Sequence, residues 1–344
     1  MNNEKLIEKI RELTLSEYRI RQIQKAVYRD GVGSFEEITV LSKDVRTRLA
    51  CELPILSFTV DKVFISSDKS TLKALIRLAD DKMIETVLIQ TKPGMWSACI
   101  SSQAGCAMAC SFCATGTAGF KRNLTSEEIS DQVLFWRQYR KKYEMKGTFS
   151  NIVYMGMGEP FANWPQVSKS IKELIDPDCF GFGSRGISVS TSGLPAGIVK
   201  LAQEFPQVNL ALSLHFADDE KRLRYMPIHK MADLAALKKA LKEYFSLTNR
   251  KVFIEYLMLN GVNDTPQDAH MLSEYLLSIT GPHLLHVNLI PYNATPAALR
   301  SSAQATMRVF RNLLEKYHIP ATIRKSMGQD IDGACGQLAG KTEK

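Results

Sequence analysis

Three closely spaced cysteines form the stretch of this sequence that is best suited to chemistry. Cys106, Cys110 and Cys113 lie in GCAMACSFCATGTAGF, residues 105–120. On a helix this spacing would place small core residues on one face, but glycine costs about 1 kcal/mol inside a helix, so the glycines of this stretch indicate a loop. A structural zinc site needs four ligands, usually as paired C-x2-C units, and the sequence has no second pair. Three thiolates instead suit a [4Fe-4S] cluster that leaves one iron open to another ligand.

A glycine-rich turn is the second candidate stretch. Residues 155–160 read MGMGEP and follow a predicted strand. Glycines often mark nothing more than a tight turn. At the carboxyl end of a strand, however, Gly158 would also allow a ligand amine to approach the backbone, and Glu159 would supply a carboxylate to bind it.

Candidate ligand contacts also lie at the ends of three later predicted strands. Ser190 lies in VSTSG, Ser213, Leu214 and His215 lie in LSLH, and Asn293 lies in IPYN. A single His or Asn is more often a hydrogen-bonded core residue. Because all of these residues lie at strand ends, where parallel sheets bind ligands, we predict that they contact a bound ligand.

Two further cysteines are candidates for a role in catalysis. Cys335 lies in IDGACGQLAG, where glycines predict an exposed loop, and Cys99 precedes Cys106 by seven residues. Either could be an inert buried thiol, which is the commoner case. Cys51 and Cys179 lie in stretches without any other signal, and we predict that both are inert.

The elements that must position these residues alternate between strands and helices. We predict strands at 98–102, 152–155, 187–191, 208–215, 252–259, 287–292 and, shorter, 321–324, with helices such as 126–142 and 235–245 between them. Thr125 and Glu128 form a capping box before the first of these helices. Repeated βα units require a parallel sheet with right-handed crossovers. Six units predict an incomplete (β/α)6 barrel in an α/β fold, with the working residues at the carboxyl ends of the strands.

The first part of the sequence predicts an accessory module. Residues 1–55 have helical patterns at 5–13, 16–28 and 34–49, the second opening on a possible cap at Ser16. A β-hairpin of 72–79 and 83–90 about an Asp80-Asp81 turn falls within a linker, 56–92. We therefore predict three parts: an N-terminal helical RNA-binding domain at 1–55, the linker at 56–92, and a catalytic core at 93–344.

Composition narrows the class of protein. The 344 residues carry 44 Lys and Arg against 36 Asp and Glu, a net charge of +8, which favours an anionic partner such as RNA, although the basic clusters could be solvated helix faces. The sequence has no apolar run of membrane-spanning length and no signal peptide. Seven cysteines, three of them clustered, favour a reducing compartment over a disulfide scaffold. We expect a cytoplasmic monomer.

The cysteine motif resembles that of a known superfamily. C-x3-C-x-aromatic-C, with Phe112 as the aromatic, resembles the signature of radical S-adenosylmethionine (SAM) enzymes, and GMGEP is similar to their SAM-amine motif with Met157 in place of the first glycine. The motifs IETV, CISSQAGC, STSG, SLH, IEYLMLNGVND, NLIPYN and DIDGACGQLAG extend the resemblance over nearly the whole chain. They resemble the bacterial dual-specificity ribosomal RNA and transfer RNA adenine-C2 methyltransferases of that superfamily.

The resemblance implies a role for each candidate residue. Cys106, Cys110 and Cys113 would bind the [4Fe-4S] cluster, and Gly158, Glu159, Ser190, Ser213, Leu214, His215 and Asn293 would contact SAM. Cys335 matches the methyl-carrying cysteine, Cys99 the second mechanistic cysteine, and Glu85 the glutamate that accepts a proton or holds the adenine. A plain salt bridge is the alternative for Glu85. Gly333 stands where the family usually has alanine, a change that loosens the loop but leaves Cys335 in place.

The implied chemistry uses two SAM molecules. One methylates the Cys335 thiolate, and a second is cleaved to a 5′-deoxyadenosyl radical that takes a hydrogen from this methyl group. The carbon radical then adds to C2 of an adenine, which gives a covalent protein–RNA intermediate. Cys99 would break it by taking the C2 proton or by forming a disulfide with Cys335. The implied partners are 23S rRNA, a tRNA, and an electron donor such as flavodoxin or ferredoxin.

Other functions remain open at this point. A sister branch with the same motifs methylates C8 of the ribosomal adenine and confers antibiotic resistance. Pro160 and Pro291 resemble the C2 branch, which we favour, whereas GMWSACISSQ and PQVNL resemble the C8 branch. More distant alternatives are a radical SAM enzyme that acts on a substrate other than RNA, an electron-transfer iron–sulfur protein and a zinc-dependent RNA-binding module.

Overall fold

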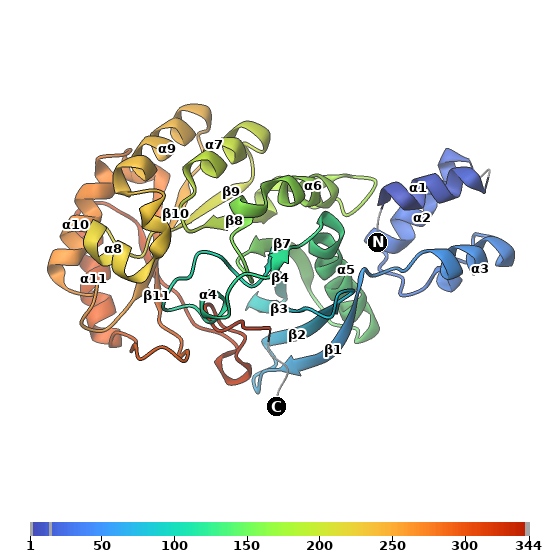
Figure 1. Cartoon of the computed structure of the whole chain (residues 1–344), viewed down its shortest axis with the longest axis horizontal. Coiled ribbons are helices and arrows are strands. Elements are labelled where there is room, and N and C mark those ends of the chain that lie inside the picture. The colour runs from blue at the N-terminus through green and yellow to red at the C-terminus, as the bar shows by residue number, and fades with distance from the viewer. Residues whose placement is uncertain (1–2, 14–15, 341–344) are drawn as a thin grey trace.

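A curved ten-stranded sheet forms the centre of the fold. In this computed structural model, which describes residues 3–13 and 16–340, the strand order is β1-β2-β3-β4-β7-β8-β9-β10-β11-β12. Helices cover the outer face of the sheet, and the N-terminal helices lie to one side (Figure 1). Across the described ranges, no helix is both long enough and apolar enough to cross a membrane.

Seven parallel strands form the barrel part of this sheet. They are β4 Met95–Cys99, β7 Thr148–Tyr154, β8 Ile187–Thr191, β9 Asn209–Ser213, β10 Val252–Met258, β11 Leu285–Pro291 and the short β12 Ala321–Ile323. The covering helices are α5 Ser126–Lys142, α6 Trp164–Ile175, α7 Pro195–Glu204, α9 Leu234–Leu247, α10 Pro266–Leu277 and α11 Gln304–Lys316, with the short α4 Ala114–Thr117 and α8 Asp219–Tyr225 in loops. The incomplete six-unit barrel is confirmed, with the predicted short strand at its edge.

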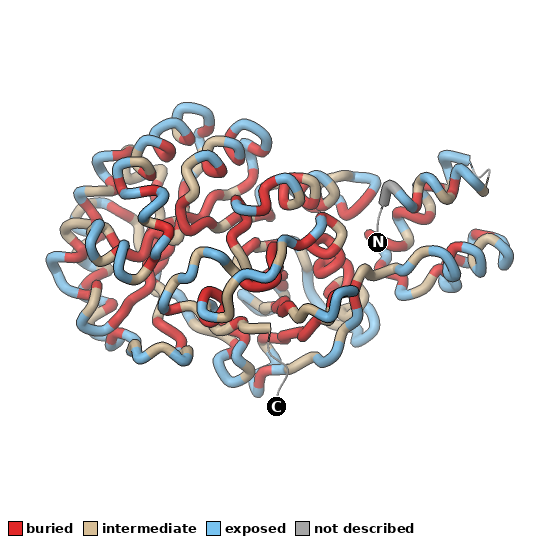
Figure 2. The backbone as a smooth tube through the Cα atoms, in the orientation of Figure 1, coloured by how far each residue is buried: buried red, intermediate tan, exposed pale blue. Residues whose placement is uncertain are grey.

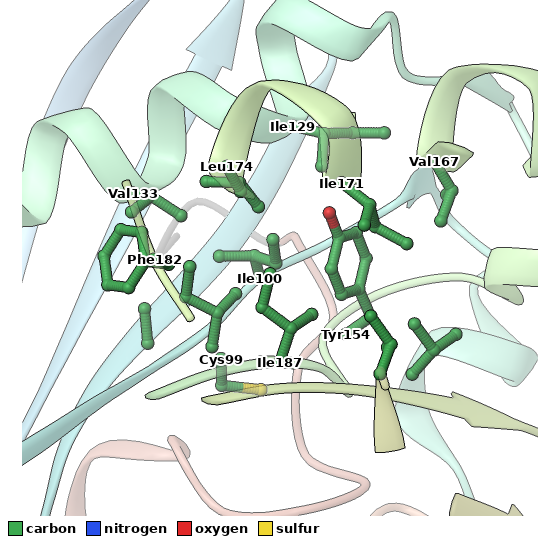
Figure 3. Packing of buried hydrophobic residues seen from close by; sticks show 14 of the residues in the cluster. Cys99, Ile100, Ile129, Val133, Tyr154, Val167, Ile171, Leu174, Phe182 and Ile187 are labelled. Atoms are coloured by element: carbon green, nitrogen blue, oxygen red, sulfur yellow. The ribbon is translucent and has the colours of Figure 1, made fainter. Parts of the chain in front are cut away.

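Alternating side chains explain why these strands form a barrel wall. Tyr154 and Ile187 point outward and pack with Ile129, Ile171 and their neighbours on α5 and α6, all fully or almost fully buried (Figure 3). Burying such side chains is the main stabilising contribution to a fold of this kind. Figure 2 shows the same division along the tube, with buried strands and exposed outer helix faces.

Polar residues occupy the opposite face of the strands. Ser213 on β9, Glu255 on β10 and Asn288 on β11 lie in register. Neighbours in register on a parallel sheet share one face, and the Asn288 amide donates to Glu255 at 2.8 Å. The inner face of the barrel is therefore polar at the ends of its strands.

Local signals fix the helix starts where the sequence predicted them. Thr125 accepts a hydrogen bond from the Glu128 N–H, and the Glu128 carboxylate accepts one from the Thr125 N–H at 3.0 Å, so the capping box is confirmed. Ser16 occupies the cap position of α2 Glu17–Gln24, but its side chain makes no capping hydrogen bond.

The predicted linker is part of the sheet. β2 Thr71–Leu78 and β3 Met83–Lys92 form the expected hairpin, but β1 Phe58–Ile65, which the sequence analysis missed, pairs with β2. A register shift between Val60 and Lys62 interrupts β1, and such a bulge breaks the alternation that reveals a strand. β3 also pairs antiparallel with β4, so this three-stranded extension continues the barrel wall.

The N-terminal module packs directly on the barrel. It contains α1 Asn3–Glu12, α2, the π-helical turn Lys25–Arg29, the 3-10 turn Phe35–Glu37 and α3 Lys43–Glu52, so the single helix predicted for 34–49 is two elements. The ring centroids of Tyr28 and Phe180 lie 4.9 Å apart. The Gln138 amide of α5 donates to the Val32 carbonyl at 2.8 Å. The module shares its buried apolar cluster with the barrel.

The segment after β12, residues 324–340, which we call the return segment, crosses the barrel opening to the other edge of the sheet. The Ser67 N–H and hydroxyl donate to Asp330 at 2.8 and 2.7 Å. A Cβ on Gly328 would lie 2.6 Å from the Thr71 side chain, which shows how closely the segment packs against β2. In Figure 1 this red segment lies beside β1 and β2. It carries Cys335 toward the antiparallel extension.

Candidate active site

The loop of three cysteines is held by close backbone contacts. A Cβ on Gly105, whose φ is 76°, would lie 1.8 Å from the Gly119 carbonyl oxygen, so only glycine fits. The Cys106 N–H donates to that same carbonyl at 3.3 Å, and the Cys113 N–H donates to the Cys110 carbonyl at 3.1 Å. The predicted loop is confirmed, except that α4 adds one helical turn after Cys113.

Phe112 anchors the loop to the barrel. Its ring is buried in a second apolar cluster with Phe216, Met226 and Leu257. Its edge also meets the His215 ring at 5.1 Å and 90°. The aromatic position in the motif therefore fixes the cysteines above the end of β9.

The donor set fits an iron–sulfur cluster. Burial raises the pKa of Cys106 to about 12, and the charges of Glu159 and Cys113 add to the shift. Burial, followed by Cys113 and Cys106, also raises the pKa of Cys110. The thiols of Cys106, Cys110 and Cys113 thus lie close enough to interact electrostatically, and binding to iron would deprotonate them. Within residues 3–13 and 16–340, no three His, Cys, Asp or Glu side chains already have the geometry of a metal site.

The GMGEP turn places a buried carboxylate beside this loop. Gly158 has φ 102°, and a Cβ there would lie 2.5 Å from Gln103, so a larger residue would be strained. Glu159 accepts hydrogen bonds from the Ser192 N–H and hydroxyl, both at 2.7 Å, and from the Phe161 N–H at 3.1 Å. Burial raises the pKa of Glu159 despite these bonds. A ligand ammonium would compensate the buried carboxylate.

Ser190, Ser213 and Leu214 meet at the ends of β8 and β9. The hydroxyls of Ser190 and Ser213 lie 3.3 Å apart, whereas the Leu214 side chain is fully buried. Beneath them, the fully buried Arg222 guanidinium donates to the carbonyls of Leu214 and Ser192 at 2.5 Å. Arg222 makes no ion pair within the described part of the chain, and burial lowers its pKa to about 10. Sequence reasoning missed this residue.

His215 is a neutral donor in this site. Its Nδ1 accepts a hydrogen bond from the Leu257 N–H at 3.1 Å, so the other ring nitrogen carries the proton. Burial, followed by the charge of Arg222, lowers its pKa to about 3. Asn263 donates to the His215 carbonyl at 2.8 Å and so supports a backbone with φ 56°.

Asn293 holds the Cys335 loop in this structure. Its amide nitrogen donates to the Cys335 carbonyl at 3.0 Å, and its oxygen accepts from the Gln329 amide at 2.7 Å. The cysteine loop adds two contacts, because the Ala114 N–H donates to the Gly336 carbonyl at 2.8 Å and the Thr115 hydroxyl donates to Leu338 at 2.6 Å. Hydrogen bonds therefore join the three-cysteine loop directly to the Cys335 loop.

The two predicted reactive thiols, Cys99 and Cys335, lie in one barrel opening. Cys335 is exposed and Cys99 is buried, and both are free thiols. Burial and then the charge of Cys335 raise the pKa of Cys99. Cys335 reaches the surface, but the protein packed around its thiol desolvates it and, with the charges of Glu255 and Cys113, raises its pKa, whereas Arg324 lowers it. The disulfide considered for the reaction is not present, since all seven cysteines are free.

Glu85 is buried and paired rather than free. Its Oε1 lies 2.9 Å from Lys73 Nζ, and its Oε2 accepts hydrogen bonds from the N–H groups of Ala339 and Gly340 at 2.6 and 2.9 Å. The salt bridge considered in the sequence analysis is present. Sequence reasoning did not find Lys73, because only the fold shows that it is buried between Glu85 on the next strand and Asp332 near the C-terminus.

Comparison with known proteins gives the class of this site. Residues 100–272, which hold the three-cysteine loop, the GMGEP turn and the ends of β8 to β10, match the Radical SAM superfamily. The chain is therefore a radical SAM protein, whose cofactors are a [4Fe-4S] cluster and SAM. A solved structure titled as a radical SAM methyltransferase from Sphaerobacter thermophilus superposes with a TM-score of 0.92 at 39% identity, over 99% of this chain and 98% of that one.

Full-length relatives define the family. The chain is 40% identical to the ribosomal RNA large subunit methyltransferase Cfr of Clostridium botulinum (strain Okra / Type B1), over 98% of this chain and 97% of the relative. It is 41% identical to a probable dual-specificity RNA methyltransferase RlmN of Chloroflexus aurantiacus, over 94% of this chain and 87% of the relative. The chain belongs to the RlmN/Cfr family of radical SAM RNA methyltransferases.

Proposed function

We propose that this protein methylates C2 of an adenine in 23S rRNA and of an adenine in a tRNA, with Cys335 as the methyl carrier. The observation that carries the proposal is the position of Cys335. The return segment brings its thiol within electrostatic range of Cys99 and of Cys113 in one barrel opening. A methyl carrier must reach both the SAM site and the substrate, and an exposed thiol at the barrel opening can do both.

Each residue of the site has a defined task in this proposal. Cys106, Cys110 and Cys113 would hold the cluster, and Glu159 would bind the SAM ammonium, with Ser190, Ser213, His215 and Asn293 completing the pocket. When bound, the cluster and SAM supply the radical and the methyl group. Cys335 contributes the nucleophilic sulfur, and its raised pKa means that its proton must leave before methyl transfer.

Cys99 would act after the RNA has been attached. It lies at the end of β4, buried and with a raised pKa, so it is an uncharged thiol until the reaction requires its proton to leave. Loss of the proton from C2 and release of the Cys335 sulfur would both take place next to it. Glu85 would hold the adenine or accept the proton only after its bonds to Lys73 and to the return segment open.

Substrate and partners follow from the family. The relatives named Cfr and RlmN act, by their names, on ribosomal RNA and on RNA with dual specificity. The net charge of +8 supports an RNA partner. We propose that the N-terminal helices contact this RNA, that flavodoxin or ferredoxin supplies electrons, and that the protein acts as a cytoplasmic monomer.

Methylation of C8 is the second candidate function. Relatives with Cfr and RlmN names match this chain at nearly equal identity, 40% and 41%. Pro160 and Pro291 favour the C2 branch by resemblance. The test is mass spectrometry of 23S rRNA and tRNA after incubation with the anaerobically reconstituted protein and methyl-labelled SAM. 2-Methyladenine in the digest supports the proposal, 8-methyladenine assigns the sister activity, and unmodified RNA with cleaved SAM would indicate another substrate.

A further inference from the structure

A single buried ion pair holds the Cys335 loop on both sides of the cysteine. Lys73 on β2 donates to the carbonyl of Asp332, three residues before Cys335, at 3.4 Å. Glu85 on β3 accepts the N–H groups of Ala339 and Gly340, on the other side, at 2.6 and 2.9 Å. The two side chains join at 2.9 Å. One pair therefore bridges the two ends of the reactive loop.

The surroundings of this pair argue against a role in stability alone. The side chains of Lys73 and Glu85 are only 9% and 4% exposed. A buried ion pair gains little net stability, because the cost of removing two charges from water offsets their attraction, and an apolar pair can often replace it without loss. Hydrogen bonds to a charged group are nonetheless directional, and the two that Glu85 accepts from the loop, at 2.6 and 2.9 Å, are short. Such a pair defines position better than it stabilises.

We propose that Lys73 is a positioning residue which, together with Glu85, sets the location of the Cys335 thiol. This inference rests on the proposed role of Cys335 as methyl carrier. Asp332, which Lys73 contacts, has a left-handed backbone with φ 50°, a conformation that non-glycine residues adopt at a cost. Without the lysine, we infer that this residue relaxes and the loop shifts, while the contacts of Asn293 and Thr115 keep the loop near the opening.

The proposal gives Glu85 a task different from proton transfer. Both of its carboxylate oxygens are engaged, one with Lys73 and the other with two N–H groups. A carboxylate with both oxygens engaged must break one of these contacts before it can approach a substrate proton. The carboxylate instead fixes the second end of the loop.

Three variants of the full-length protein test the positioning role. K73M removes the ammonium but keeps an apolar stem, E85Q removes the negative charge, and K73M/E85L replaces the pair with apolar side chains. The control is R77M/D61N, which removes a more exposed ion pair of the same antiparallel extension, between Arg77 on β2 and Asp61 on β1, at 2.5 Å. Within the described residues, neither side chain of this control pair hydrogen-bonds to residues 328–340.

The first measurement is hydrogen exchange of the peptides that cover residues 329–340. Loss of charge-assisted hydrogen bonds should raise their exchange rate by roughly tenfold or more in all three variants, and R77M/D61N should exchange as the parent does. The second is the rate at which SAM methylates Cys335 in the reconstituted protein, followed by mass spectrometry. We expect a rate roughly tenfold lower with an unchanged KM for SAM, because the SAM residues keep their places.

The apolar double variant separates position from stability. If the pair only stabilises the fold, K73M/E85L recovers the melting temperature and, with it, parent-like exchange and methylation, which would overturn the proposal. If the pair positions the loop, melting recovers while exchange stays fast and methylation slow. Should the parent protein itself acquire no methyl group on Cys335, the proposed function fails, whereas the exchange data still decide whether Lys73 and Glu85 hold the loop.

Discussion

Replacement of Arg222 is the perturbation whose size the structure defines best. The guanidinium is fully buried, has no carboxylate within ion-pair distance in the described residues, and donates to the carbonyls of Ser192 and Leu214, which belong to the loops after β8 and β9. Arg222→Met would keep much of the apolar volume and remove both bonds. Those bonds join the two loops that carry Ser190, Ser213 and His215, which we propose contact SAM.

Two opposing contributions set the expected magnitude. Two hydrogen bonds to a charged group are worth roughly 1.5–3 kcal/mol each. Against this, burial lowers the pKa of Arg222 from 12.5 to about 10, a shift that corresponds to roughly 3 kcal/mol of desolvation cost that methionine does not have. The free energy of unfolding should therefore change by only about 0–3 kcal/mol. The loops after β8 and β9, however, lose the hydrogen bonds that join them.

SAM affinity should respond more than stability does. We expect Arg222→Met to weaken SAM binding by roughly tenfold to a hundredfold, the equivalent of one lost charge-assisted bond. Arg222→Lys should also weaken binding, because an ammonium lacks the rigid, branched guanidinium that bonds to both loops at once. The assay is anaerobic equilibrium dialysis of SAM, with urea unfolding in parallel. SAM affinity within twofold of the parent in a folded variant would refute the reasoning.

Three further predictions concern the thiols, one carboxyl group and the RNA. After one turnover with SAM and RNA, Cys99→Ala should give a shifted band on a denaturing gel, and Cys335→Ala and the double variant should not; a band that survives loss of Cys335 contradicts the methyl-carrier role. Burial raises the pKa of Glu173 from 4.5 to about 7, so the folded state binds the extra proton and the free energy of unfolding should fall as pH rises from about 5 to 7; urea titrations of Glu173→Gln should lose this slope, and an unchanged slope contradicts it. Charge reversal of the exposed Lys43 and Arg48 on α3 should lower RNA affinity and its salt dependence without changing iron content, whereas equal affinity would remove this helix from the RNA interface.

Local patterns predicted most of the barrel. Strand β8 matches its predicted bounds of 187–191, and α5 begins at its capping box. These features succeed because periodicity and capping act over a few residues. β1 was missed because a bulge disrupts its alternation, and the two elements in place of one N-terminal helix show that apolar spacing alone does not define a helix end.

The supporting residues of the site could not be predicted, because tertiary contacts select them. In α8, hydropathy predicts that Leu223 is buried and Arg222 exposed, but Arg222 is fully buried and Leu223 is 41% exposed. Lys73 looks like an ordinary strand residue until its partners Glu85 and Asp332 are known. A buried charge that contradicts local hydropathy carries a cost, so such positions are where function is best sought.

The meeting of Cys99 and Cys335 follows from how the sheet is completed. β12, which precedes Cys335, lies at one edge of the sheet. β4, which ends at Cys99, is separated from β12 by the five strands β7 to β11. Pairing between strands therefore cannot join the two thiols. The return segment joins them because it contacts β2 at Asp332 and β3 at Ala339, and β3 is the neighbour of β4. If Cys335 is the methyl carrier, as we propose, the antiparallel extension is a functional part of the catalytic core, since β2 and β3 provide the surface that holds the Cys335 loop.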